Sequence, residues 1–123
     1  MIKSKIKPLL PSLREKKRYL AFEIISKAKI KRSDSVFKAI TASAVGFMGE
    51  LGCSKAGIKT LNDRWDEGSQ KGVLRVSSKY VDATRTAISL VRQIDDNEVI
   101  VRTIGVSGIL KKATQKFLLQ KEG

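Results

Sequence analysis

Hydrophobic and polar positions alternate along residues 17–26, and this alternation predicts a half-buried β-strand. Leu20, Phe22 and Ile24 point to one face, and Lys17, Tyr19, Ala21 and Glu23 point to the other. From Ser33 or Asp34, either of which is a suitable N-cap, apolar residues follow helical spacing to about Met48. The predicted buried side of this helix consists of Phe37, Ile40, Ala44, Phe47 and Leu51. Gly49 and Gly52 are expected beyond its end as stop signals.

The pattern of the second half predicts a β-hairpin and another helix. Residues 58–65 form a weak strand interrupted by polar side chains, and a polar loop, 66–72, joins it to a strand over 73–77. Ser77 or Ser78 is then the expected N-cap of a helix. Its predicted buried side consists of Tyr80, Val81, Thr84, Ala87, Ile88, Val91 and Ile94. Residues 95–97, Asp-Asp-Asn, are expected to end this helix and turn the chain into a last strand.

The last strand is predicted over residues 99–104, where β-branched residues dominate, and a basic helix is predicted over 109–120. Gly105 and Gly108 suggest a tight turn between the two, with Ser107 as the N-cap of the helix. The helix has an apolar stripe of Ile109, Leu110, Ala113 and Phe117, with Lys111, Lys112 and Lys116 beside it. Because helix N-termini bind anions, the turn is a candidate phosphate cradle, although an ordinary strand-to-helix connection has the same pattern.

The predicted order is β-α-β-β-α-β with an additional C-terminal helix. This is the plan of an α+β, ferredoxin-like (RRM-like) fold, an antiparallel sheet with two helices on one face. We expect a single domain over residues 17–123, preceded by an extended basic arm over residues 1–16 that contains both prolines.

Charge is distributed unevenly along the chain and indicates a polyanionic partner. The net charge is +13, with 25 Lys and Arg against 12 Asp and Glu. Residues 1–32 hold 11 basic and 2 acidic side chains and residues 99–123 hold 5 and 1, whereas residues 33–98 are balanced at 9 and 9. This segregation favours nucleic acid as the partner. The candidate RNA-binding residues are Lys5, Lys7, Arg14, Lys16, Lys17, Arg18, Arg102, Gly105, Ser107, Gly108, Lys111, Lys112 and Lys116.

Several other functions are disfavoured by composition. The chain has no histidine and one cysteine, so His-dependent nucleophiles and nearly all zinc sites are excluded. No signal pattern or apolar run near 18 residues is evident, so we expect a soluble cytoplasmic protein that binds no membrane; the basic helix lying on an anionic membrane is the alternative. Asp63, Asp66 and Glu67 could serve a magnesium-dependent nuclease, but acids beside Gly and Ser are common turn residues.

Aromatic residues do not predict an RNA-stacking surface. Lys71-Gly72 opens the third strand as in RNA-recognition modules, but no ring follows it. We therefore interpret Tyr19 as a half-packed strand residue and Trp65 as a core or protein-contact residue.

Three motifs resemble the RNase P protein component 2 family of archaeal and eukaryotic ribonuclease P. They are Leu-Pro-Ser-Leu-Arg-Glu-Lys-Lys-Arg-Tyr at 10–19, Gly-Glu-Leu-Gly at 49–52 and Arg-Thr-Ile-Gly-Val-Ser-Gly at 102–108. The resemblance runs from about Leu10 to Phe117, although Ile109 stands where the family most often has threonine.

The resemblance implies a non-catalytic subunit of the particle that removes 5′ leaders from precursor tRNA, with catalysis and Mg²⁺ on the RNA and no cofactor on the protein. Its implied partners are the RNase P RNA, precursor tRNA, the TIM-barrel-like RNase P component 3 and further protein subunits. The alternatives are another structured-RNA-binding protein, such as a ribosomal one, and the nuclease above.

Overall fold

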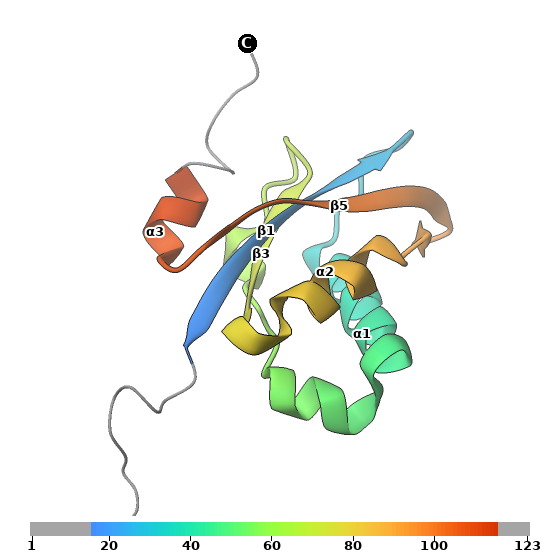
Figure 1. Ribbon diagram of the computed structural model, residues 1–123. Helices are drawn as coiled ribbons and strands as arrows, with labels where there is room; N and C mark the ends of the chain where they lie inside the picture. The colour runs from blue at the N-terminus through green and yellow to red at the C-terminus, as the bar shows by residue number, and fades with distance from the viewer. Residues whose placement is uncertain (1–15, 116–123) are drawn as a thin grey trace, which may run out of the picture.

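The computed structural model describes residues 16–115, which form one antiparallel sheet with helices on both faces (Figure 1). The strands lie in the order β2-β3-β1-β5-β4. Their bounds are β1 Lys17–Ser26, β2 Lys59–Thr60, β3 Lys71–Ser77, β4 Gln93–Ile94 and β5 Asn97–Ser107. Helices α1 (Ser33–Ala56) and α2 (Val81–Ser89) cover one face, and the short α3 (Leu110–Ala113) lies on the other. The predicted ferredoxin-like fold is confirmed, with β4 as an additional short strand.

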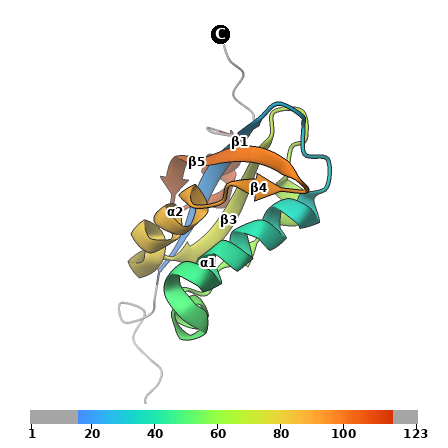
Figure 2. The same ribbon diagram turned by 90° about the vertical axis from the view of Figure 1, so that its right-hand side faces the viewer.

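The main core lies between the sheet and the two longer helices, which run side by side in Figure 2. Strand β1 has the predicted bounds, and Leu20, Phe22 and Ile24 are buried as its alternation requires. The side chains of Val99 and Val101, on the neighbouring strand β5, pack into the same core. Burying one such side chain stabilises the fold by about 1.5–3 kcal/mol, so this layer is the main source of stability.

Gly72 allows two aromatic rings to pack against β3. It is paired with Phe22, whose ring stacks on Trp65 at a centroid distance of 6.5 Å and meets Phe37 edge-on at 5.8 Å. A Cβ added at Gly72 would lie 2.8 Å from the Phe22 ring and 3.1 Å from Trp65. The glycine therefore provides space for the rings, and Trp65 is confirmed as a partly buried residue that packs against the core.

Gln70 connects the loop after β1 to the loop before β3. Its side chain is buried, accepts a hydrogen bond from the Ile30 N–H at 2.9 Å, and donates to the carbonyls of Ile30 at 3.0 Å and Glu67 at 2.8 Å. The backbone of Gln70 is left-handed, with φ of 57°. Through Ile30 this glutamine fixes the basic loop 27–32.

Helix α1 is longer than predicted. The backbone leaves helical geometry at Gly49 (φ 78°, ψ 169°), but a second helical segment follows and ends at Gly57, a left-handed C-cap whose N–H donates to Cys53 O at 3.1 Å. Gly52 is therefore inside the helix and not beyond its end. The predicted caps Ser33 and Asp34 are also wrong by one or two residues, because Arg32 occupies the N-cap position without a side-chain hydrogen bond.

The predicted buried face of α1 is correct only for its first half. Phe37, Ile40 and Ala44 are buried, but Phe47 is 48% exposed and Leu51 is 70% exposed. The kink at Gly49 redirects the helix, so constant helical spacing no longer faces the sheet at Leu51, which follows the kink.

Three further predictions in the second half need correction. The strand predicted over 58–65 is reduced to β2, because the interrupting polar residues form a 3-10 helix, η3 (Asn62–Arg64). The cap predicted at Ser77 or Ser78 is replaced by η4 (Ser78–Tyr80), from which α2 continues. Helix α2 ends at Ser89, so Val91 and Ile94 are buried outside it. Asp95 and Asp96, both with positive φ, form the two-residue turn of the β4–β5 hairpin.

Candidate nucleic-acid interface

The predicted glycine turn of residues 105–108 is not a turn. Strand β5 continues to Ser107, with Gly105 opposite Ala21 and Ser107 opposite Tyr19. The register shifts between Ala21 and Phe22, so Ile104 is an extra residue of β5 and a β-bulge absorbs it. Gly105 therefore serves a bulge in a paired strand and does not cradle a phosphate in a turn.

The helix after β5 begins at Leu110, with Ile109 at its N-cap position, so Ser107 is not its cap. The Ser107 hydroxyl instead accepts a hydrogen bond from the Ile109 N–H at 3.1 Å, which shapes the link between strand and helix. Gly108 has no positive φ, and a Cβ there would meet only Arg18, at 3.6 Å. The tight turn expected at this position is therefore wrong.

The fold nevertheless brings two of the predicted basic segments together. Because β1 and β5 are antiparallel, the start of β1 lies beside the end of β5. Arg18, whose guanidinium donates to Lys17 O at 3.1 Å, lies against Gly108, and α3 with Lys111 and Lys112 follows directly. Both of these lysines and Lys16 are exposed. We call this set, Lys16, Lys17, Arg18, Lys111 and Lys112, the basic end of the sheet.

Arg102 does not belong to the basic end. It forms an ion pair with Glu23, the residue opposite it on β1. Five residues of strand separate Arg102 from Ser107, which is about 16 Å at roughly 3.3 Å per residue. Arg102, one of the candidate RNA-binding residues, is therefore too far from Lys111 and Lys112 to bind the same anion as they do, although its side chain is 64% exposed.

The remaining predicted sites, Lys5, Lys7, Arg14 and Lys116, lie outside the described residues, as does nearly all of the arm 1–16. The face of the sheet opposite α1 and α2 carries a small cluster of Ala21 and Val73 with Tyr19, Leu61, Ile104 and Leu110 packed against it. The interpretation of Tyr19 as a half-packed strand residue is thus confirmed.

Two cations on this outer face were missed by sequence reasoning. Arg75 shares its face with Val73, two residues away on β3, and Lys59 of β2 lies directly opposite Arg75. The signal was present in β3, where Lys71, Val73 and Arg75 alternate with Gly72, Leu74 and Val76 of the core side. The prediction for that strand considered only aromatic rings and so did not include Arg75.

The acidic loop 63–67 shows the bonding of a turn. The Asp66 carboxylate accepts hydrogen bonds from the Gly68 N–H at 3.0 Å and the Ser69 hydroxyl at 2.9 Å. These bonds hold the loop before β3, as expected for an aspartate in a turn.

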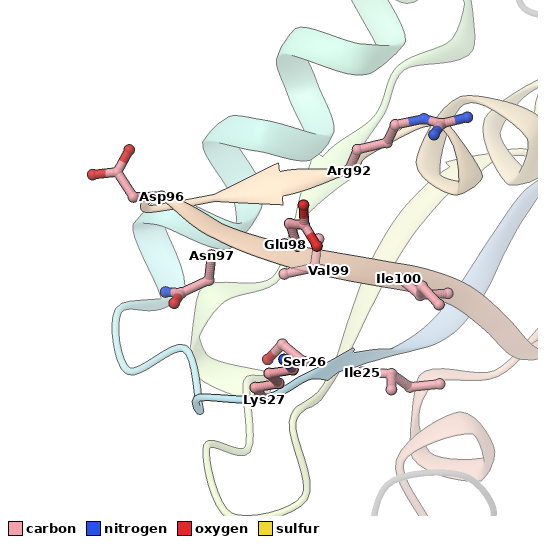
Figure 3. A pocket seen from close by; sticks show the side chains of 9 residues that line it. All are labelled: Ile25, Ser26, Lys27, Arg92, Asp96, Asn97, Glu98, Val99 and Ile100. Carbon is pink, nitrogen blue, oxygen red and sulfur yellow. The ribbon is translucent and has the colours of Figure 1, made fainter.

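A groove of about 720 Å³ lies at the other end of the β1–β5 pair (Figure 3). Lys27 and Arg92 are balanced there by Asp96 and Glu98. Ile25 and Ile100, which are paired across the two strands, are 47% and 62% exposed. This balance of charge suits a polyanion less well than the basic end does.

The second half of α1 exposes a different kind of surface. Val45, Phe47 and Leu51 are 38%, 48% and 70% exposed, and space is open around Gly46. Residues 39–54 contain no Lys or Arg and only one acid, Glu50, in a chain of net charge +13. By length and composition α1 could cross a membrane, so the expectation that the chain has no apolar run near 18 residues is wrong for this helix. In the structure 22% of its most apolar 18-residue window is buried. We call Val45, Phe47 and Leu51 the apolar face of α1.

Comparisons with known proteins agree with the resemblance seen in the sequence. Residues 18–118 match the model of the Rpp14/Pop5 family. The chain is 43% identical to "Ribonuclease P protein component 2" of Thermococcus gammatolerans over 119 residues, which cover 97% of each protein. It is 42% identical to the protein of the same name from Methanosarcina mazei over 118 residues, which cover 96% of this chain and 97% of the other. A chain in the cryo-EM structure of yeast ribonuclease MRP has the same fold, with a TM-score of 0.61 at 14% identity over 86% of this chain and 88% of that one.

Proposed function

This chain belongs to the Rpp14/Pop5 family, and from that premise we propose that it is a non-catalytic subunit of ribonuclease P. In this role it binds and organises the catalytic RNA while the 5′ leader is removed from precursor tRNA. The RNA component holds the Mg²⁺ and performs the hydrolysis, and the protein supplies cations and shape.

The observation that carries this proposal is the basic end of the sheet. Two segments about 90 residues apart in sequence, Lys16–Arg18 and Lys111–Lys112, are placed side by side by the pairing of β1 with β5. Their cations are suited to phosphate, because lysine and arginine neutralise the backbone without reading bases. RNA bound there would be recognised by shape and backbone, in keeping with the absence of free aromatic rings on the strands that the structure describes.

Salt dependence of RNA binding tests the basic end. Replacing Lys111 and Lys112 together by alanine should weaken binding of the cognate catalytic RNA and lower the slope of log Kd against log salt by about 0.7–0.9 for each phosphate that is no longer neutralised. Lys38→Ala together with Lys55→Ala removes the same charge from α1 and is the matched control. An equal reduction of the slope in both double variants would show that only net charge matters and would overturn the role of the basic end.

Activity assays distinguish a non-catalytic ribonuclease P subunit from a magnesium-dependent nuclease. The protein alone should not cleave precursor tRNA but should lower the Mg²⁺ concentration that the catalytic RNA needs. Cleavage by the purified protein that is lost on Asp63→Ala or Asp66→Ala would instead establish the magnesium-dependent nuclease. Binding to ribosomal RNA in preference to RNase P RNA would favour the ribosomal-type alternative.

The apolar face of α1 is suited to the protein partner, which we take to be RNase P component 3. Exposed apolar side chains without cations bind a protein surface better than RNA, and they need to be covered in a stable particle. Phe47→Glu and Leu51→Glu should reduce co-purification with component 3 while leaving the salt slope for RNA unchanged. Lys38→Glu, on the same helix, is the control.

Two other occupants of this face give different results. Concentration-dependent dimerisation of the purified chain, lost on Leu51→Glu, would assign the face to a second copy. Co-sedimentation of the chain with neutral vesicles would assign it to a membrane. Either result would refute the contact with component 3.

A further inference from the structure

Arg75 lies in a row of residues that crosses four strands. Register places Lys59 of β2, Arg75 of β3, Tyr19 of β1 and Ser107 of β5 next to one another. The row is on the outer face, since Tyr19 packs with Val73 and Leu110 beneath α3. Because neighbouring strands are about 4.8 Å apart, the row extends about 14 Å from Lys59 to the last strand of the basic end.

The guanidinium of Arg75 lacks an acceptor among the residues that the structure describes. Its Nε atom is buried, and the side chain makes no hydrogen bond or ion pair within residues 16–115. Leaving a buried charged donor without an acceptor destabilises the fold, because the desolvation of that group is not compensated. Buried donors in native folds generally have an acceptor. For Arg75 that acceptor is not among residues 16–115.

The charge next to Arg75 has the same sign. Lys59 is its direct cross-strand neighbour, and like charges directly opposite each other destabilise a sheet. The first acid along β1 on this face is Glu23, four residues beyond Tyr19, and it forms an ion pair with Arg102. Two adjacent cations without an acid beside them in the described part of the chain favour an anion between or above them.

We propose that Arg75 and Lys59 form a phosphate-binding site on the outer face of the sheet, separate from the basic end and continuous with it through Tyr19 and Ser107. The planar fork of Arg75 donates to two oxygens of the phosphate, and the Lys59 ammonium adds a point charge. The phosphate is a phosphodiester of the RNA backbone. The assignment of the phosphate to RNA rests on the proposed function, whereas the existence of the site rests on the positions of Arg75 and Lys59.

Nuclear magnetic resonance on the full chain tests the site directly. Titration with inorganic phosphate should shift the Nε–H resonance of Arg75 more than that of Arg85, an exposed arginine on α2 that serves as the control. The shift should weaken in Lys59→Ala. A resonance of Arg75 that stays unmoved by both phosphate and RNA would overturn the proposal.

RNA affinity then identifies the source of the phosphate. Arg75→Gln and Lys59→Ala should each lower the affinity of the protein for its cognate RNA about tenfold or more. Arg75→Lys should recover part of this affinity, whereas the control Arg85→Gln should change it little. Lys59→Ala, at an exposed position, keeps the test valid if Arg75→Gln fails to fold.

The two hypotheses fail differently. If RNA binding depends on Lys111 and Lys112 but not on Arg75 or Lys59, the new site is refuted and the proposed function stands. If the wild-type chain binds inorganic phosphate through Arg75 but binds neither RNase P RNA nor an unrelated duplex RNA, the site stands and the proposed function fails.

Discussion

Replacing Gln70 by alanine should destabilise the fold by about 3 kcal/mol. The substitution removes three side-chain hydrogen bonds, two to Ile30 and one to Glu67, each with a net contribution of about 1 kcal/mol. Ile30 is 1% exposed, so water cannot readily replace those bonds. The backbone hydrogen bond from the Ile24 N–H to Gln70 O, at 2.8 Å, is unaffected by the change.

A glycine variant separates the hydrogen bonds from backbone strain. With φ of 57°, position 70 is left-handed, which costs an L-residue about 1–2 kcal/mol that glycine does not incur. Gln70→Gly should therefore be at least as stable as Gln70→Ala, although glycine is normally the less stable choice. Gln93→Ala, on the exposed edge strand β4, should stay within about 0.5 kcal/mol of the wild type and is the control.

Urea unfolding followed by Trp65 fluorescence measures these free energies, since Trp65 packs against Phe22 in the core. An alanine variant within about 0.5 kcal/mol of the wild type would refute the reasoning, because the hydrogen bonds would then contribute nothing net.

Three further predictions concern positions whose surroundings are known in detail. Gly72→Ala should lower the free energy of unfolding by about 1–3 kcal/mol in urea titrations, since its Cβ would lie 2.8 Å from Phe22, whereas Gly108→Ala, with 3.6 Å to Arg18, should change it little. Gly49→Ala should destabilise the fold by about 1–3 kcal/mol, while Gly46→Ala should stabilise it by up to about 1 kcal/mol by thermal melting; equal effects would refute the kink at Gly49. Burial raises the pKa of the Cys53 thiol, so less thiolate is present near neutral pH and alkylation by iodoacetamide should be slower than in urea; equal rates would contradict this.

The alternation in β1 and the order of elements were enough to predict the sheet and the two helices that cover it. Each prediction rested on a local signal, such as the period of two in residues 17–26, that the tertiary fold preserves. The exposure of Leu51 was not predictable in this way, because the direction of α1 after Gly49 depends on a backbone rotation that spacing does not encode.

The candidate site was predicted in part. Glycines at 105 and 108 were interpreted as a turn because glycine is common in turns, yet a bulge in a paired strand also uses glycine. The choice between the two depends on whether β1 is long enough to pair with Ser107, which is a property of another segment. The position of Arg75 beside Lys59 likewise depends on the register of β2 with β3, and no pattern within either strand specifies it.

The separation of cations from the apolar face of α1 has a kinetic consequence. A molecule with one strongly positive end is oriented by the field of a polyanion before contact, so it should meet RNA rapidly at low salt, with an association rate that falls steeply as salt rises. Capture through uncharged side chains such as Phe47 and Leu51 should be slower and nearly independent of salt. Ionic strength would thus set the order of assembly. At low salt the chain would bind RNA first, and as salt increases a larger share of molecules would bind the protein partner before RNA.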